Sequence, residues 1–514
     1  MHGGGSASPA NDEELIADFA ATGDNLVIVD WNGPDDPDNP FNWSKAQKWL
    51  VTFIALFTTF LVLANGTIIT VAHYELDQRF HVSEATFANS YWPVTTWALG
   101  GSFFSLIILP TMEDFGIRRT FLLTHFTFIL FLIPQAVAQN FATLIVTRFF
   151  AGGCVAVLGN SAASVIGNIW ASERERTIPV GLWILAYLGG SSIGPVLGAS
   201  ILQFLSWRWI SYMQLIWHGL LFPVAMVTMR ESRDLVILKQ RAKKLRAKGI
   251  NAYTRHEILA EPILDVLKTS IQRPLKMLVT EYVVFFCMLW SSFTVGTLYL
   301  FTQSVEQVFE ALYGWDPVQS GYVQGAIVIG EVLGWPLTLI SARLYFHSAK
   351  PNPQMPGVPI PEARLYMSVA GAIVGLTGGM FVYAWTSDPR LPWIAPTMGL
   401  GMVGAGSVVV VTGIMDYVVD AYSNYAGSAM ACVVLGENTF SAFLPLATMN
   451  MYQSLGLQWA SSLLGFISLT LTLAPVCIII WGAKIRARSP FMKEAMVQKA
   501  PAVNAEDAED KITC

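Results

Sequence analysis

The sequence predicts an all-α membrane protein with twelve transmembrane helices in two six-helix bundles. Of its 514 residues, 53% are hydrophobic and 13% are charged, whereas a soluble domain carries about 25% charged residues. The mean hydropathy is +0.48. Windows of about 20 apolar residues, each long enough to cross roughly 30 Å of hydrocarbon, occur twelve times, and a polar interval separates the sixth from the seventh.

The expected spans follow from these windows in chain order. Those of the first half cover residues 48–72, 88–109, 120–138, 142–166, 178–204 and 209–229. Those of the second half cover residues 277–301, 318–345, 362–385, 393–416, 425–449 and 459–481. The chain therefore divides into an acidic tail (1–47), a first bundle (48–229), a basic linker (230–276), a second bundle (277–482) and a C-terminal tail (483–514).

The distribution of charge predicts the orientation. With the N-terminus inside, the cytoplasmic segments hold 27 of the 31 Lys and Arg residues, as membrane proteins prefer, so both termini are expected in the cytoplasm. The first 44 residues contain nine acids and no Lys or Arg, which predicts a disordered tail and no secretory signal.

The linker contains twelve Lys and Arg residues. It is expected to form short helices along the cytoplasmic membrane surface, attracted to anionic headgroups. It serves either as a solvated connection or as a latch that braces one conformation. The five cysteines indicate neither a disulfide framework nor a metal site.

The fifth expected span contains "GGSSIGPVLG" (189–198), in which Gly190, Gly194 and Gly198 recur every four residues beside Pro195. In a bilayer, small residues let helices approach closely, and neighbouring helices satisfy the backbone groups that a proline frees. The stretch resembles the fifth-span antiporter motif of the major facilitator superfamily. The resemblance implies the major facilitator fold, an exporter, and a bend and packing seam between the two halves. An ordinary small-residue packing face is the alternative.

The loop after the second span, "PTMEDFGIRR", resembles a second motif of that superfamily. The resemblance implies a charge relay that locks the cytoplasmic side. Its members would be Glu113 or Asp114, Gly116, Arg118 and Arg119. Leu109 stands where the family has Gly, and Ile117 where it has Arg, so the gate is altered or the arginines serve only to set the topology.

Arg148 is the only Lys or Arg that lies more than two residues inside an expected span, and a charge within a span costs about 3 kcal/mol or more. Its surroundings, "RFFAGG" (148–153), resemble the fourth-span motif of the superfamily, which implies a part in proton coupling. The alternative is an arginine near the end of the span that reaches outward to the membrane surface.

A narrower resemblance, to fungal twelve-span drug/proton antiporters, extends over nearly the whole chain. It rests on "DDPDNPFNWSKAQKW" (35–49), "RPLKMLVTE" (273–281), "PEARL" (361–365), "YVVDAYSNYAGSA" (417–429) and "PLATMNMYQSLGLQWASSLLG" (445–465). Asp420 and Tyr422 are expected to tie helix ends on the cytoplasmic side. One departure is that Glu437 stands where related eleventh spans have Arg.

Two acids lie deep in expected spans, Glu437 in the eleventh and Glu331 in the eighth. Desolvation disfavours the charged form of a carboxyl unless it is paired, so both are candidate proton carriers. Either could instead bind a cationic substrate or donate a hydrogen bond to a neighbouring helix.

The other candidates for a substrate cavity are aromatic or amide side chains. They are Tyr91, Trp97, Asn160, Tyr187, Trp290, Gln324 and Asn438. Such a lining suits a bulky amphipathic organic molecule better than a sugar, which needs denser hydrogen bonding.

Together these features predict a proton-coupled efflux transporter for a xenobiotic or a secondary metabolite. A proton-coupled importer of a small cationic or organic nutrient and a non-transporting membrane sensor or scaffold are the alternatives. The chain has no phosphate-cradling loop and no zinc motif, and its G-x-S-x-G match at residues 190–194 lies inside an expected span and not at the strand-to-helix turn of a nucleophile elbow, which argues against an ATP-driven pump and an enzyme. We therefore expect no cofactor and no metal, a proton gradient as the energy source, a small-molecule substrate and the lipid bilayer as partners, no nucleic acid, and a monomer. The plasma membrane is the expected location, with the vacuolar membrane as the alternative.

Overall fold

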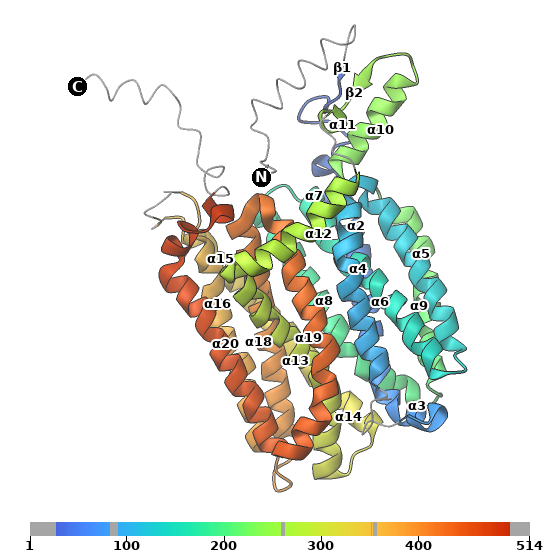
Figure 1. Ribbon diagram of the computed structural model, residues 1–514, viewed down its shortest axis with the longest axis vertical. Helices are drawn as coiled ribbons and strands as arrows, with labels where there is room; N and C mark the ends of the chain where they lie inside the picture. Colours follow the sequence, from blue (N-terminus) through green and yellow to red (C-terminus); the bar gives the residue numbers. More distant parts are fainter. Residues whose placement is uncertain (1–26, 83–90, 259–262, 351, 353–356, 494–514) are drawn as a thin grey trace, which may run out of the picture.

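The computed structural model describes residues 27–82, 91–258, 263–350, 352 and 357–493. Two helical bundles lie side by side, the N-terminal half in blue to cyan-green and the C-terminal half in yellow-green to red (Figure 1). Apart from the two-residue strands β1 (Val27–Ile28) and β2 (Ala252–Tyr253), the regular structure of the described residues is helical. The predicted all-α class is confirmed.

The helices of the N-terminal half are α2 (Lys45–Thr67), α3 (His73–Phe80), α4 (Trp92–Phe115), α5 (Ile117–Ala136), α6 (Phe141–Leu158), α7 (Ser161–Ile169), α8 (Glu173–Leu202) and α9 (Arg208–Thr228), with the short turns η1 (Pro40–Asn42) and η2 (Thr70–Ala72). The linker forms α10 (Asp234–Arg246), β2, α11 (Arg255–Ile258) and α12 (Ile263–Thr280). The C-terminal half contains α13 (Tyr282–Tyr313), α14 (Pro317–Val323), α15 (Gly325–His347), η3 (Pro361–Arg364), α16 (Leu365–Ala370), η4 (Gly371–Thr377), α17 (Gly378–Thr386), α18 (Ile394–Tyr422), η5 (Ser423–Tyr425), α19 (Ala426–Leu455) and α20 (Leu457–Arg486).

Eleven helical segments among the described residues are long and apolar enough to cross a membrane. Helix α4 occupies the place of the second expected span, so the arrangement agrees with twelve spans in two sets of six. The start of α2 and the end of α20 lie on the same side of the bundles as the linker (Figure 1). We call this end the linker face and the opposite end the far face.

Side-chain caps mark where several of the membrane helices begin. Ser44 accepts a hydrogen bond from the amide of Gln47 at the start of α2, and Asn140 and Ser172 cap α6 and α8 in the same way. Asp316 forms a reciprocal capping box at the start of α14. Such caps satisfy amides that have no partner inside the helix, so polar loop residues define the helix starts.

Two expected span ends differ from the structure. The seventh expected span ends at residue 301, but α13 continues to Tyr313. The first expected span ends at residue 72, but the chain continues helically through η2 and α3 to Phe80. The two extensions contact each other at the far face through the side chains of His73 and Glu306, and both helical segments are longer than the apolar windows from which their lengths were predicted.

Glycines bring neighbouring membrane helices into close contact. A Cβ at Gly379 would stand 2.7 Å from the carbonyl oxygen of Gly399, and one at Gly334 would stand 2.6 Å from that of Ala405. The backbones of α15 and α17 therefore lie so close to the backbone of α18 that no side chain fits between them at these positions, as small residues permit in a bilayer. The same packing surrounds η4, a π-helical turn, in which Gly375 lies against Gly406.

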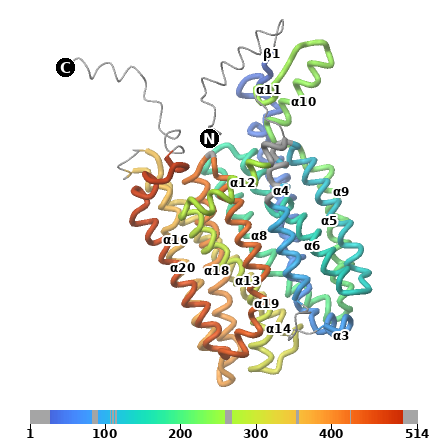
Figure 2. Tube along the Cα trace, in the orientation of Figure 1, coloured from blue at the N-terminus to red at the C-terminus, as the bar shows by residue number. Residues whose placement is uncertain are grey.

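The tail and the first part of the linker, from α10 to α11, form a small unit that stands off the linker face (Figure 2). Strand β1 of the tail pairs in parallel with β2 of the linker. The disorder expected over residues 1–47 is therefore not observed from Val27 onward, because the linker supplies partners that the acidic tail lacks by itself. Residues 1–26 lie outside the described part of the chain.

Candidate functional site

Helix α8 lies between the two halves and contacts both buried acids. The Oγ of Ser192 donates a hydrogen bond of 2.6 Å to Oε1 of Glu331 on α15. The hydroxyl of Tyr187 lies 3.5 Å from Oε2 of Glu437 on α19. One helix of the N-terminal half thus reaches the two carboxyls of the C-terminal half.

Glu437 is enclosed between α8, α13 and α19. Its side chain is buried, with 1% of its surface exposed, and Oε1 accepts a hydrogen bond of 2.5 Å from Ser291 of α13. Both carboxyl oxygens therefore face hydroxyl groups, and among the described residues no Lys or Arg forms an ion pair with Glu437.

Glu331 is fully buried but has fewer partners. Its Oε1 accepts from Ser192, while no donor in the described part of the chain reaches Oε2. The free oxygen faces α8 at Gly189, where an added Cβ would stand 3.5 Å away. An oxygen of this kind can accept a hydrogen bond from a bound molecule or hold a proton.

Arg148 lies in the interior of the N-terminal half, with 1% of its surface exposed. Its guanidinium donates to three backbone carbonyls, those of Pro93 at 2.7 Å, Asn65 at 2.9 Å and Gly66 at 2.8 Å. The carbonyls belong to α2 and α4, so the alternative in which Arg148 reaches outward to the membrane surface does not fit this geometry. The side chain joins α6 to two other helices.

The polar interior includes residues that the sequence analysis did not select. The hydroxyl of Tyr299 lies 3.3 Å from Oγ of Ser191, and its ring is 6.4 Å from that of Trp97. The side-chain amides of Asn65 and Gln214 form a hydrogen bond. Asn65 and Gln214 could have been selected from the sequence, because each is a polar residue in the middle of an apolar span.

The seven expected cavity residues do not form one cluster. Tyr187 and Trp97 adjoin the acids and Tyr299, and Asn438 lies against Gly101 of α4. The other four are placed elsewhere. The amide of Asn160 donates to Ala156 of α6, Gln324 donates to Thr302, Trp290 packs in the C-terminal half, and the ring of Tyr91 lies near that of His73.

The antiporter motif packs mainly within the N-terminal half. A Cβ at Gly190 would stand 2.6 Å from the carbonyl oxygen of Phe60, and Gly194 and Gly198 likewise lie against α2 around Ile68. Pro195 is inside α8, and its carbonyl faces Gly321 of α14. The seam expected between the halves is thus formed by the other side of α8, and the three glycines join α8 to α2.

At the linker face the loop motif is organised by an acid that the sequence analysis missed. Gly116 is the single residue between α4 and α5 and has a φ of +93°, which favours glycine. Glu231 accepts from the amides of Ile117 at 3.0 Å and Arg118 at 3.3 Å. Arg119 is exposed. The side chains of Glu113 and Asp114 lie outside the described part, so the predicted relay stays a prediction.

The C-terminal half has its own charge cluster at the linker face. Arg364 donates to Asp420 at 2.9 Å and to Asp416 at 3.1 Å, and the hydroxyl of Tyr422 donates to Glu281 at 3.1 Å. The expectation that Asp420 and Tyr422 tie helix ends together is confirmed. Arg364 was missed as a site residue, although it is part of the quoted "PEARL" segment.

Contacts at the far face also join the halves. His73 lies 3.2 Å from Glu306 of α13, and Tyr322 of α14 donates to Gln203 at 2.8 Å. Toward the linker face, the guanidinium of Arg174 on α8 lies 5.4 Å from the ring centre of Phe346. The two halves therefore contact each other on both sides of the central acids.

Comparisons with known proteins agree with this architecture. The family model of the Major Facilitator Superfamily matches residues 49–438. The MFS-type transporter paaT of Penicillium rubens is 32% identical over 459 residues, which cover 89% of this chain and 82% of the relative. The citrinin biosynthesis cluster MFS transporter mrr1 of Monascus ruber is 31% identical over 475 residues, 91% and 92% of the two chains.

A third relative is the MFS-type efflux pump MFS2 of Trichophyton rubrum, 30% identical over 490 residues that cover 94% of this chain and 81% of the relative. Among solved structures, the proton:xylose symporter XylE bound to 6-bromo-6-deoxy-D-glucose matches with a TM-score of 0.61 and 15% identity, over 85% of this chain and 97% of that chain. At this identity the match is evidence of a shared fold.

Proposed function

Because the chain belongs to the major facilitator superfamily, and is therefore a membrane transporter and not an enzyme, we propose that it exports a small amphipathic organic compound in exchange for protons. The compound would be a secondary metabolite or a xenobiotic. The names of relatives support this choice, since one is an efflux pump and another belongs to a citrinin biosynthesis cluster.

The observation that carries the proposal is the contact of two buried acids with one helix. Tyr187 and Ser192 lie on α8 of the N-terminal half, and their partners Glu437 and Glu331 lie on α19 and α15 of the other half. A buried carboxylate without a cation costs far more free energy than a neutral carboxyl. Gain or loss of a proton therefore changes the interaction between the halves.

This arrangement suits alternating access, in which two bundles rock around a central site. Opening of the far face would separate His73 from Glu306 and expose the acids to protons on that side. Closure would return the protonated carboxyls to their hydroxyl partners on α8. Opening of the linker face would then release the proton on the other side, where substrate enters.

Arg148 would serve this cycle as a fixed cation in the N-terminal half. Its three carbonyl partners hold α2, α4 and α6 together, so these helices would move as one body against the acids. We place the linker face in the cytoplasm, because the segments expected on that side contain 27 of the 31 basic residues of the sequence, and we place the protein in the plasma membrane as a monomer without a cofactor.

The proposal is tested by the accumulation of fluorescent and cytotoxic amphiphiles in exporter-deficient yeast. Wild type is compared with Glu437→Gln, Glu331→Gln and Arg148→Ala, with and without a protonophore. Glu175→Gln is the matched control, because Glu175 is an exposed acid on α8. The amount of each variant in the plasma membrane is measured in the same cells.

Export predicts less accumulation with wild type and with Glu175→Gln than with empty vector, and loss of this difference in the presence of the protonophore. An acid whose glutamine variant reaches the membrane but no longer exports is placed in the coupling path. Higher accumulation with wild type would favour the importer. Accumulation equal to empty vector for every compound would count against transport of this class and favour a sensor or scaffold.

A further inference from the structure

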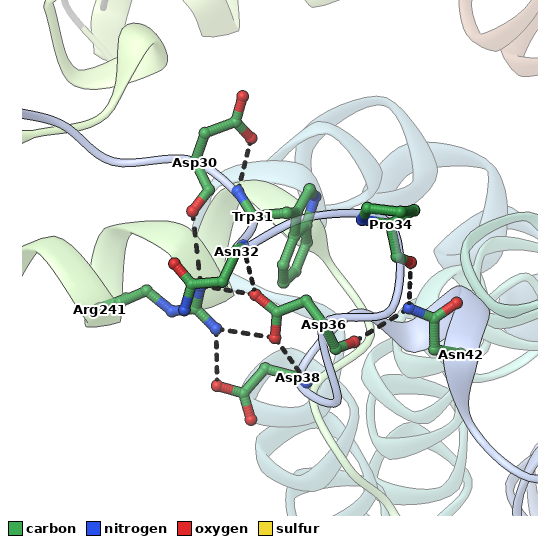
Figure 3. Close-up of polar contacts among 8 residues, drawn as sticks. All are labelled: Asp30, Trp31, Asn32, Pro34, Asp36, Asp38, Asn42 and Arg241. Atoms are coloured by element: carbon green, nitrogen blue, oxygen red, sulfur yellow. Dashed lines mark hydrogen bonds and ion pairs between the residues drawn. The ribbon is translucent and has the colours of Figure 1, made fainter.

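An acidic segment of the tail meets a basic helix of the linker (Figure 3). The guanidinium of Arg241 donates to both carboxylate oxygens of Asp36, at 2.8 and 3.1 Å, and to Asp38 at 2.8 Å. The carboxylate of Asp36 also accepts from the amides of Asn32 at 2.8 Å and Asp38 at 3.0 Å. Arg241 further lies 5.6 Å from the ring centre of Trp31. Forked charge-assisted bonds of this type are strong and geometrically specific.

The backbone of the tail is held as well. The amides of Val27 and Val29 donate to the carbonyls of Asn251 and Tyr253, each at 2.9 Å, as β1 pairs with β2. A small apolar core lies beneath this pair. It consists of Val29, Ala242 and Ala252, with Leu238 and Leu245 packed against them. We call residues 27–42 together with residues 234–258 the clasp.

Both arms of the clasp are fixed to the N-terminal half. On the tail side, the ammonium group of Lys48 in α2 donates to the carbonyl of Phe41 at 2.8 Å, and Asn42 donates back to the turn at Asp36 at 3.0 Å. On the linker side, Glu231 binds the amide of Ile117 at the start of α5. The clasp is therefore expected to move with the N-terminal half.

Further contacts within the clasp fix the linker up to the end of α11. Arg246 donates to Glu257 at 2.9 Å and to the carbonyl of Ala252 at 2.7 Å. Four residues separate the end of α11 from the start of α12. Helix α12 contacts α4 and packs on α19. The thiol of Cys432 on α19 donates to the carbonyl of Pro274 on α12 at 3.0 Å. Only Glu281 separates α12 from α13 of the C-terminal half.

The clasp thereby shortens the covalent connection between the halves. Between Ile258 and Ile263 there are four residues, and a chain of that length reaches at most about 18 Å. If the clasp opened, the connection would begin near Glu231 and could reach about 80 Å even with α10 helical. We propose that docking of the N-terminal tail on the linker limits how far the two halves separate at the linker face. This inference requires only two moving bundles and is independent of the direction of transport.

The test measures the distance between the halves by pulsed electron paramagnetic resonance on the full chain in lipid nanodiscs. Spin labels are attached to Glu175→Cys on α8 and Lys484→Cys on α20, two exposed positions near the linker face. Cys477, which is exposed, and Cys514 are replaced by serine. Cys154, Cys287 and Cys432 are kept because they are buried.

Arg241→Ala opens the clasp, and Lys244→Ala is the matched control, because Lys244 is an exposed cation on the same helix. Trypsin cleavage of α10 in the same samples reports whether the clasp has opened. The proposal expects faster cleavage with Arg241→Ala, and an upper end of the distance distribution that moves outward on the order of 5–10 Å, up to the diameter of a packed helix. The control should match wild type in both measurements.

Asp36→Ala should change cleavage and distances in the same direction as Arg241→Ala, because it removes the forked pair with Arg241. The double variant Asp36→Ala/Arg241→Ala should move the distances by less than the sum of the two single variants, because both remove that pair. Faster cleavage with unchanged distances would overturn the proposal, since the clasp would then be open without freeing the halves. Cleavage at the wild-type rate would overturn it too, since Arg241 would not hold the clasp.

Discussion

The contact between the antiporter motif and α2 predicts the effect of a single added methyl group. In Gly194→Ala, the new Cβ would stand 2.8 Å from the amide nitrogen of Ile68, 2.9 Å from the carbonyl oxygen of Ala64, and closer still to the hydroxyl of Thr67. Favourable contacts between heavy atoms lie near 3.5–4.0 Å, so α2 and α8 must move apart by roughly 0.5–1 Å.

Two costs follow from this displacement. Overpacking of an interior costs about 1–3 kcal/mol. Thr67 also donates a hydrogen bond of 2.6 Å to the carbonyl of Ser191, and its loss costs about 0.5–1.5 kcal/mol. We expect the N-terminal half to lose about 2 kcal/mol or more, which lowers the unfolding midpoint of the detergent-solubilised protein by roughly 4–8 °C. Fluorescence-detected size-exclusion chromatography after heating measures this midpoint.

Gly219→Ala is the control, because a Cβ at Gly219 on α9 meets no atom within 4 Å. Both substitutions share any gain from the higher helix propensity of alanine, so the difference between them isolates the contact with α2. Equal midpoints for the two variants would refute the reasoning, since α2 and α8 would then not be in close contact at Gly194.

Three further outcomes are expected. Gly116→Ala should destabilise by about 1–3 kcal/mol, and more than Gly249→Ala, because both have positive φ but only Gly116 lies against Glu231; thermal midpoints compare them. Arg148→Lys should lower thermal stability and transport together, since an ammonium group lacks the planar fork that serves three carbonyls. The clasp should be stable across neutral pH, because hydrogen bonds from Arg241 and backbone amides hold the pKa of Asp36 well below its usual range. The contribution of the ionised Asp36 to the stability of the clasp is therefore present above about pH 4 and is lost as the pH falls further. Hydrogen exchange of the β1 amides, corrected for intrinsic rates, should therefore be unchanged between about pH 5 and 8.

The fold could be predicted in outline because bilayer thickness sets the length of an apolar window. The same argument fails where a helix continues past the bilayer. Helix α13 runs to Tyr313, past its apolar window, and its Glu306 contacts His73 across the far face. Hydropathy carries no information about that contact. The acidic tail is a similar case, since its composition predicts disorder while Arg241 on the linker supplies the missing partner.

The candidate site divides in the same way. Arg148, Glu331 and Glu437 could be selected from the sequence, because a charged residue is conspicuous in an apolar span. Their partners could not, since Ser192 and Ser291 are common residue types whose relevance depends on helix packing. The cavity residues were chosen by type alone, and the structure separates several of them.

Helix α8 connects these observations. One side of it carries Gly190, Gly194 and Gly198 against α2, which makes α8 a rigid part of the N-terminal half. Its other side carries Tyr187 and Ser192 against the two acids of the C-terminal half. A helix that is rigid within its own half cannot follow the acids when the halves separate, so the hydroxyl bonds must break at each opening. In the mechanism proposed above, the cost of breaking them depends on whether the carboxyls hold protons, and this dependence would couple a proton gradient to movement of the halves.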